Sequence, residues 1–318
     1  MNTNHKVIIS KGRILGLCCI IACLIASIII LQNLVSENAF SQLSNLLNPS
    51  VLLLLVLLYA CHFFAEPIRW SAYALHIQGQ SKFISIFACF NITALLSYSL
   101  PLKLGLPLRL FLLSHFLKLK GKKIIQIMTM DGFFSLASWS IIALLLIISI
   151  PEIGDYYSSY ISPVVLLLAL FGLGLLLLWL LRLKGWLPLA TFRSVPGHII
   201  ILVLLTLTVD ILLYGVRHLV IVEALGIEIS SYQIFAISIV AVFAGIISTL
   251  PMGLGAYDVS LMALMSLYGV DIEMGLIVAF TNRLGMILTS ILFGAPSSLA
   301  LLHTEIPDSK LQANYEPD

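Results

Sequence analysis

Long stretches of apolar residues recur along the whole chain, separated by short polar segments. Runs such as Val51–Ala60 and Ile141–Ile150 contain no charged side chain. Several of these stretches are about as long as the ~20 residues that a helix needs to cross a bilayer. The sequence therefore predicts an all-α polytopic membrane protein.

Charge is scarce and nearly balanced. Charged residues make up 10% of the 318-residue chain, whereas soluble domains contain roughly 25%. The formal net charge of +2 excludes a nucleic-acid binder that works by bulk charge, and the apolar content excludes a disordered chain. The five cysteines all lie in apolar stretches, and their odd number does not suit a disulfide framework. We expect no metal site and no cofactor.

Two of the apolar segments are too short to span a bilayer. The segments are 14–35, 50–66, 83–100, 106–117, 124–150, 161–181, 198–222, 232–250, 256–268 and 274–302. At 1.5 Å per residue, 106–117 and 256–268 each extend under ~20 Å. Each follows a break at which proline removes a helical hydrogen bond, so a helix is expected to stop there. The breaks contain Pro101, Gly105 and Pro107 in the first case and Pro251, Gly253 and Gly255 in the second.

Lysine and arginine in the short loops predict the orientation of the segments. Basic residues before segment 14–35 place the N-terminus in the cytoplasm, and we interpret this segment as a retained first helix rather than a signal peptide. The basic cluster at 118–123 places both ends of 83–117 on the cytoplasmic side, as a re-entrant helical hairpin. Segment 232–268 is flanked by acidic loops and is expected to enter from outside. The tail, 303–318, is expected to be cytoplasmic, in a prokaryotic cytoplasmic membrane.

Both halves of the chain show the same order: span, span, re-entrant pair, span. Pro251 lies 150 residues after Pro101, and Gly255 lies 150 residues after Gly105. Because the first half contains three full spans, the second half is inserted upside down. The sequence thus predicts six full spans and two broken hairpins, arranged as inverted repeats over 1–150 and 161–302. This pattern is typical of transporters that bind substrate between the repeats.

Ionisable side chains within a bilayer are costly and usually face a protein interior or an aqueous cavity. Asp210, Tyr214 and Arg217 share one helix face, because seven residues make two turns. The predicted substrate-binding residues are Arg109, Asp131, Asp210, Tyr214, Arg217, Asp258 and Arg283.

The short helices are expected to place two of these residues near their N-termini. Asp258 falls in the first turn of its helix, where the dipole favours an acid. Arg109 falls in the first turn of the other, opened by Pro107 at the first helical position. Backbone N–H groups at that tip, together with Arg109, would suit a phosphate.

The same polar residues also allow interpretations that are purely structural. The three intramembrane arginines would pair with Asp131, Asp210 and Asp258 merely to hold the bundle together. The sequence Glu66-Pro-Ile-Arg-Trp70 is typical of a helix anchor at the cytoplasmic interface. His62 and Glu66 share a helix face and could ligate a metal, but no third ligand is apparent. No nucleotide loop or catalytic grouping is present, so we predict no catalytic residue.

The segment Leu100–Arg109, LPLKLGLPLR, resembles the LPxxxGxxxR signature of the flippase-like, lysylphosphatidylglycerol-synthase transmembrane family. Leu250–Asp258, LPMGLGAYD, with the later Asn282-Arg283, resembles the family's second motif. The span after the first motif has Asp131-Gly132 where relatives often have Glu-Arg. The resemblance covers nearly the whole chain and implies a stand-alone membrane domain. Relatives move aminoacylated phosphatidylglycerol between leaflets or serve polyprenyl-linked sugar or hopanoid pathways.

The leading hypothesis is a non-enzymatic flippase-like transporter. Its expected substrate is an anionic or aminoacylated phospholipid, or a polyprenyl-phosphate-linked molecule. The alternative is an integral-membrane glycosyltransferase acting on a lipid-linked sugar, for which Glu37, Glu152 and Asp155 are the candidate carboxylates outside the membrane. A third hypothesis is a scaffold for cell-envelope assembly. The sequence leaves open a partner from cell-envelope biosynthesis and the oligomeric state.

Overall fold

The computed structural model describes residues 44–79, 82–99, 105–117, 121–149, 195–248 and 255–304. Within these ranges the labelled elements are all α-helices, which confirms the predicted all-α class. They are α3 (Pro49–Gln78), α4 (Phe83–Ser99), α5 (Gly105–Leu117), α6 (Gly121–Ser149), α10 (Gly197–Ala224), α11 (Ser231–Ile247), α12 (Ala256–Ser266) and α13 (Ile272–Thr304).

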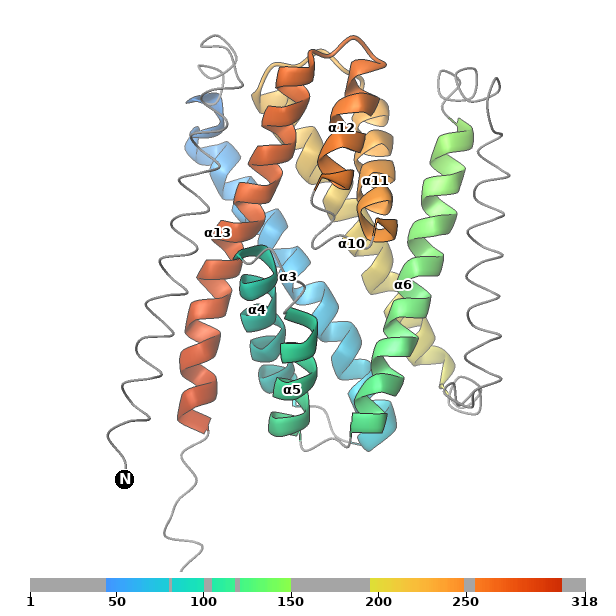
Figure 1. The fold of residues 1–318 in the computed structure, drawn as a ribbon, viewed down its shortest axis with the longest axis vertical. Helices are drawn as coiled ribbons and strands as arrows, with labels where there is room; N and C mark the ends of the chain where they lie inside the picture. Colours follow the sequence, from blue (N-terminus) through green and yellow to red (C-terminus); the bar gives the residue numbers. More distant parts are fainter. Residues whose placement is uncertain are drawn as a thin grey trace, which may run out of the picture.

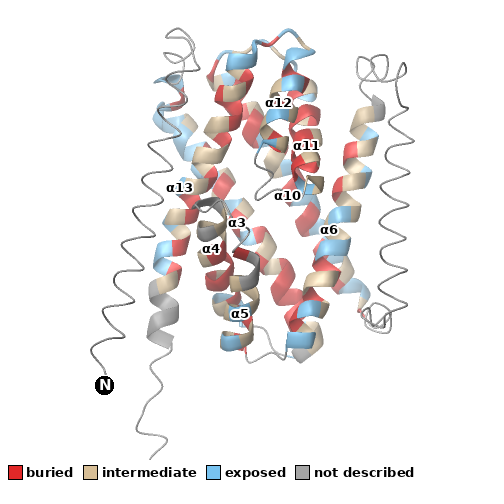
Figure 2. Cartoon of the chain, viewed as in Figure 1, coloured by how far each residue is buried: buried red, intermediate tan, exposed pale blue. Residues whose placement is uncertain are grey.

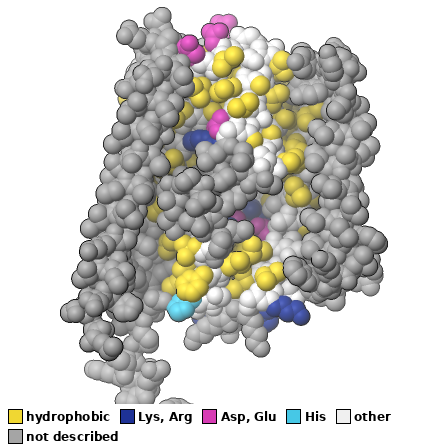
Figure 3. Space-filling view, viewed as in Figure 1, with side chains coloured by type: hydrophobic (Ala, Val, Ile, Leu, Met, Phe, Trp, Pro, Cys, Tyr) yellow, Lys and Arg dark blue, Asp and Glu magenta, His cyan; other side chains and the backbone are white. Residues whose placement is uncertain are grey.

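Four of the described helices, α3, α6, α10 and α13, are long and apolar enough to cross a membrane. Their outward faces carry large apolar side chains, such as Leu53, Leu205 and Leu292, which are more than half exposed. Exposed apolar surface of this extent suits lipid rather than water as the surroundings. In Figure 3, apolar side chains cover much of the described part of this face, and charged groups lie at the ends and at a few places near mid-height.

Four shorter helices form two pairs in opposite halves of the bundle. Figure 1 shows α4 and α5 side by side in the lower half and α11 and α12 in the upper half, each pair reaching the middle. The pairs have 17 and 13 residues, and 17 and 11 residues, so each helix is shorter than the ~20 residues that typically span a bilayer. Helices α4 and α11 end before the two predicted breaks, and α5 and α12 begin at or after their last glycines. Pro101, Pro251 and Gly253 lie outside the described residues.

The helices of the bundle pack mainly in pairs. Helix α3 packs against α10, α4 packs against α13, and α11 packs against α6. One cluster of buried apolar side chains joins α11, α12 and α13 to parts of α3, α6 and α10. A second joins α4 and α5 to other parts of α3, α6 and α10, and in Figure 2 the buried residues lie on the inward helix faces.

Two predicted helix boundaries are wrong. The span predicted to end at residue 66 continues to Gln78, because Pro67 is accommodated within α3 and the charges after it are buried and paired. Helix α5 begins at Gly105, so Pro107 is its third residue rather than its first, and Arg109 follows the first turn. The predicted spans 14–35 and 161–181 lie outside the described residues. So does the predicted tail, apart from its first two residues, which end α13.

Candidate functional site

A stripe of polar side chains runs along one face of the otherwise apolar helix α3. Tyr59, His62, Glu66 and Arg69 follow one another at intervals of three or four residues, which places them on one side of a helix. Each bonds to a different helix of the bundle: α13, α10, α5 and α6, respectively. Helix α3 is therefore the element around which the buried polar groups gather.

The first cluster lies at a cavity of about 170 Å³ between α3, α4 and α5. The Arg109 Nη1 donates to Glu66 Oε1 at 2.6 Å, and its Nε donates to Thr93 Oγ1 at 3.1 Å. The Arg109 guanidinium also lies 3.9 Å from the centre of the Phe90 ring. The Glu66 side chain is 38% exposed, so its carboxylate is accessible as well as paired.

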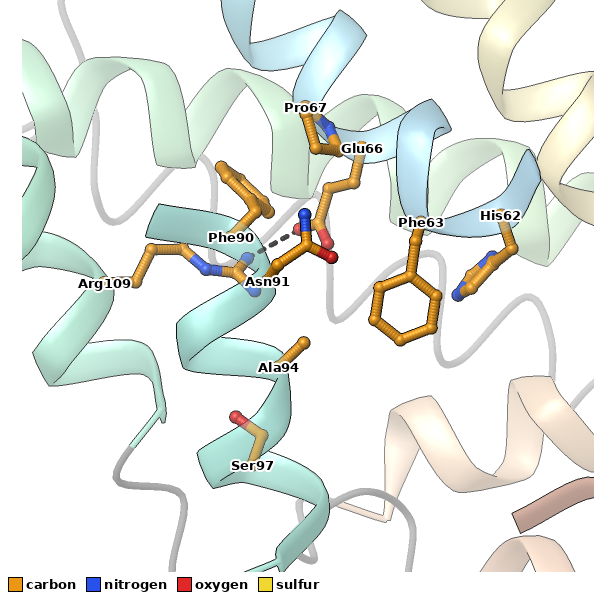
Figure 4. Close-up of a pocket in the computed structure, with 9 residues that line it drawn as sticks. All are labelled: His62, Phe63, Glu66, Pro67, Phe90, Asn91, Ala94, Ser97 and Arg109. Atoms are coloured by element: carbon orange, nitrogen blue, oxygen red, sulfur yellow. Dashed lines mark hydrogen bonds and ion pairs between the residues drawn. The ribbon is translucent and has the colours of Figure 1, made fainter. Parts of the chain in front are cut away.

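Figure 4 shows how the cavity is walled. His62 and Phe63 of α3 lie on one side, Ala94 and Ser97 of α4 on the other, and the Arg109–Glu66 pair closes one end. We call this space the α3–α5 cavity; it is lined by His62, Phe63, Glu66, Pro67, Phe90, Asn91, Ala94, Ser97 and Arg109. Its wall thus combines a cation, an anion and apolar surface.

The second cluster lies deeper, where α3 meets α6 and α10. Asp131 accepts hydrogen bonds from Arg69 Nε at 3.0 Å and from Trp70 Nε1 at 3.1 Å. Asp210 Oδ1 lies 2.5 Å from His62 Nδ1, and its Oδ2 lies 3.8 Å from Arg69 Nη1. The anchor interpretation of Arg69 and Trp70 is wrong: both are at least 96% buried and reach the acid of α6 rather than a membrane surface.

The third cluster fastens α12 to α13. Arg283 donates from Nε and Nη2 to the two carboxylate oxygens of Asp258, at 2.6 and 2.5 Å. Asp258 Oδ2 also accepts from the Gly255 N–H at 3.0 Å. This bond places the acid in the first turn of α12, as the sequence predicts. A planar guanidinium bound through two N–H groups holds the carboxylate in a defined orientation.

Arg217 of α10 is fully buried between aromatic rings. Its guanidinium carbon lies 4.1 Å from the Tyr214 ring centre and 4.7 Å from that of Tyr59. The Nη1 donates to the sulfur of Met286 at 3.0 Å. Its Nε and Nη2 have no hydrogen-bond partner in the described structure. Among the described residues, Arg217 has no carboxylate within ion-pair distance.

A chain of polar contacts continues from Arg217 toward the third cluster. The Tyr59 hydroxyl donates to the side-chain oxygen of Asn282 at 3.1 Å. The Asn282 amide donates to the Tyr257 hydroxyl at 3.0 Å, and His218 Nε2 lies 2.5 Å from the same hydroxyl. These contacts connect α3, α10, α12 and α13 through groups that are all buried.

The structure brings the predicted residues together in part. Arg283 pairs with Asp258, but Arg109 pairs with Glu66, and Asp131 and Asp210 both pair with Arg69. The hypothesis that three arginines pair with three aspartates thus holds for one pair only. Sequence reasoning missed His62, Glu66 and Arg69 as partners, together with Tyr59, Tyr257, His218 and Asn282. The three-or-four-residue spacing on α3 was the available signal.

Long apolar helices whose interior holds buried ion pairs define an integral membrane protein with a polar core. The chain belongs to the family described as the lysylphosphatidylglycerol synthase TM region, whose sequence model matches residues 14–294. This confirms the family that the two Pro/Gly motifs resemble. Comparison with curated proteins finds no match.

Proposed function

We propose that the chain moves a phosphate-bearing lipid between the leaflets of a prokaryotic cytoplasmic membrane, with both termini in the cytoplasm. The lipid is an anionic or aminoacylated phospholipid, or a polyprenyl-phosphate-linked molecule. The observation that supports this most directly is the α3–α5 cavity, which has a paired cation and anion, Arg109 and Glu66, within an apolar bundle. The cavity lies beside the short helices α4 and α5, a position that suits a head group entering from one side of the membrane.

The chemistry of the cavity matches a lipid head group. The Arg109 guanidinium can bind phosphate oxygens, and the half-exposed Glu66 carboxylate can bind an amine. Phe63, Phe90 and Ala94 supply apolar wall. Without a ligand, Arg109 and Glu66 neutralise each other. The phosphate and amine of a zwitterionic or aminoacylated head group would replace Glu66 and Arg109, respectively, as the partner of the other residue. The acyl chains would remain against the exposed apolar helix faces.

An inverted repeat, as alternating access requires, is supported by the element order. Helices α10, α11, α12 and α13 begin 148, 148, 151 and 151 residues after α3, α4, α5 and α6. Exchanging each helix for its counterpart turns the α4–α13 contact into α11–α6, α3–α13 into α10–α6, and leaves α3–α10 unchanged. Each of these contacts exists in the structure.

The centre of the molecule supports the same relation at residue level. His62 and Asp210 are 148 residues apart, the offset of the helices on which they lie, and they contact each other at 2.5 Å. Two equivalent positions meet only at the axis that relates the halves. We therefore propose that the axis of the repeat passes between α3 and α10, where His62 meets Asp210, and that the two hairpins are opposing half-gates.

Each proposed half-gate is fastened by one ion pair. In the first half Arg109 ties α5 to Glu66 of α3, and in the second Asp258 ties α12 to Arg283 of α13. Both pairs are partly exposed, whereas those around Arg69 are buried. Partly exposed pairs can exchange partners with a substrate at lower desolvation cost, so these two pairs are the ones expected to open.

The test is lipid movement in proteoliposomes. We expect Glu66→Gln, Arg109→Met and Arg283→Met each to slow movement of a fluorescent phospholipid by roughly tenfold, the effect of losing one charge-assisted contact. Lys122→Gln and Glu223→Gln remove exposed charges at helix ends and are expected to leave the rate unchanged. Parent-like rates in all three site variants, or formation of a glycosylated lipid from a labelled sugar donor, would overturn the proposal.

A further inference from the structure

The two halves place an arginine at equivalent positions of α3 and α10. Arg69 and Arg217 are 148 residues apart, the same offset that separates the starts of the two helices. The next residue in each case, Trp70 or His218, is also buried. Both arginines point into the bundle interior and both are at least 96% buried. The surroundings of each arginine can therefore be compared with those of the other.

The partners of the two arginines differ in charge. Arg69 faces two carboxylates, Asp131 on α6 and Asp210 on α10. At the helix offsets of 151 and 148 residues, the positions equivalent to these acids hold Asn282 and His62. The second half thus retains the buried cation but lacks both negative charges that accompany it in the first half.

Two N–H groups of the Arg217 guanidinium have no hydrogen-bond acceptor in the described structure. Its side chain has no exposed surface, and its Nε and Nη2 donate to no acceptor among the described residues. The rings of Tyr59 and Tyr214 attract the positive charge but do not satisfy these two N–H directions. Asp210, two turns away on α10, interacts with Arg217 only at longer range. A buried cation without a directly bonded anion is costly, and in proteins such charges are normally paired.

We infer that Arg217 is an anion site that binds the phosphate group of a lipid, an inference that rests on the proposed function. Nε and Nη2 of a guanidinium lie side by side and match two phosphate oxygens. The substrate phosphate would supply the negative charge that Asp131 supplies to Arg69 in the other half.

A path to the site begins at the α3–α5 cavity. His62 lines this cavity, and its ring centre lies 5.0 Å from that of Tyr214. The guanidinium of Arg217 lies 4.1 Å from the centre of the same Tyr214 ring. A single aromatic side chain therefore contacts both the cavity wall and the anion site. A displacement of the Tyr214 ring would connect the two.

The sharpest test is Asn282→Asp, which installs the missing carboxylate. Asn282 lies one helical turn before Met286, which already accepts from Arg217, so an aspartate there can reach the guanidinium. We expect this variant to unfold at a higher temperature and to bind dioctanoyl phosphatidylglycerol at least about tenfold more weakly. Asn45→Asp adds the same charge at an exposed position and is expected to change neither property.

Binding is measured by titrating the purified full-length chain in detergent with three probes: dioctanoyl phosphatidylglycerol, dioctanoylglycerol and inorganic phosphate. Loss confined to the phosphatidylglycerol supports a lipid phosphate at Arg217. Inorganic phosphate that binds the parent but not Asn282→Asp also supports the anion site. In that case the ligand of Arg217 can be free phosphate as well as a lipid phosphate. Arg217→Met provides a second variant, expected to lose the same binding where it folds.

Two outcomes would overturn the inference. One is unchanged binding of phosphatidylglycerol by Asn282→Asp; the other is an equal loss of phosphatidylglycerol and dioctanoylglycerol, which would indicate damage to the acyl-chain site. Failure of the proposed function is distinguishable. A parent chain that binds the lipid through Arg217 without moving it would refute transport alone, whereas transport with unaltered binding in Asn282→Asp would refute the anion site alone.

Discussion

Asp131 shows how one carboxylate can organise a membrane interior. It accepts from both Arg69 and Trp70 of α3, and it is only 8% exposed. Removing one member of a buried ion pair leaves the other charge uncompensated, which costs more than the pair itself contributes. Asp210 lies farther from Arg69, at 3.8 Å, and replaces only part of that interaction.

We therefore expect Asp131→Asn to lower the free energy of unfolding by about 3 kcal/mol, the cost of breaking a buried pair. Titration with a denaturing detergent, followed by circular dichroism, measures the change. Asp271→Asn, at an exposed position before α13, is the control and is expected to change stability by less than about 0.5 kcal/mol. A loss of that small size in Asp131→Asn would show that Arg69 is compensated elsewhere.

The sequence identified the charges that lie within the membrane but assigned most of their partners wrongly. Asp131, Asp210 and Arg217 were predicted as interior residues because charge in an apolar segment is costly, and all three are buried. The partners depend on helix crossings that hydropathy does not specify. Arg69 and Glu66 follow a short apolar run and adjoin Pro67, features that an interface anchor shares, so composition alone could not separate the two interpretations.

At the scale of elements, the glycines of the two breaks serve different purposes. A Cβ at Gly105 would collide with Ser97 Oγ and lie 2.7 Å from the Thr93 carbonyl oxygen, so α5 can approach α4 only without a side chain there. Gly255 has a φ of 81° at the start of α12, a conformation that favours glycine. The 150-residue spacing located both turns, but it could not tell close packing from backbone conformation.

Gly105→Ala is expected to destabilise the α4–α5 pair by about 1–3 kcal/mol, the usual cost of overpacking. Gly132→Ala provides a matched control on α6, since a Cβ there meets nothing within 4 Å and its φ is not positive. That control should be neutral or slightly stabilising, because alanine favours a helix. Thermal unfolding of the two variants in detergent makes the comparison. Equal melting temperatures would refute the close packing.

Across the whole molecule, the proposed transport mechanism requires two halves related by an axis between α3 and α10. The order of spans predicted this relation, and the offsets of the described helices support it. What the sequence did not reveal is the contact between His62 and Asp210, the residue at the matching offset in the other half, at 2.5 Å. Contacts of this kind require three-dimensional crossing geometry, since the two residues are 148 positions apart.

A reciprocal exchange tests this relation. His62→Asp places two carboxylates together and Asp210→His two imidazoles, so each single variant is expected to be destabilised. The proposed axis would make the positions equivalent, so the double variant should regain stability, with a coupling free energy of about 1 kcal/mol. A double-mutant cycle in detergent provides this value. Additive losses would contradict equivalent environments at the two positions.

The most direct measurement of the central proposal, movement of a lipid between leaflets, uses the unmodified chain. The protein is reconstituted with a fluorescent phosphatidylglycerol, and dithionite is added outside to bleach the lipid in the outer leaflet. We predict that bleaching proceeds to completion in proteoliposomes and stops at the outer-leaflet fraction in empty liposomes. Bleaching that stops at the same level in both, for this lipid and for aminoacylated and polyprenyl-phosphate analogues, would contradict the account.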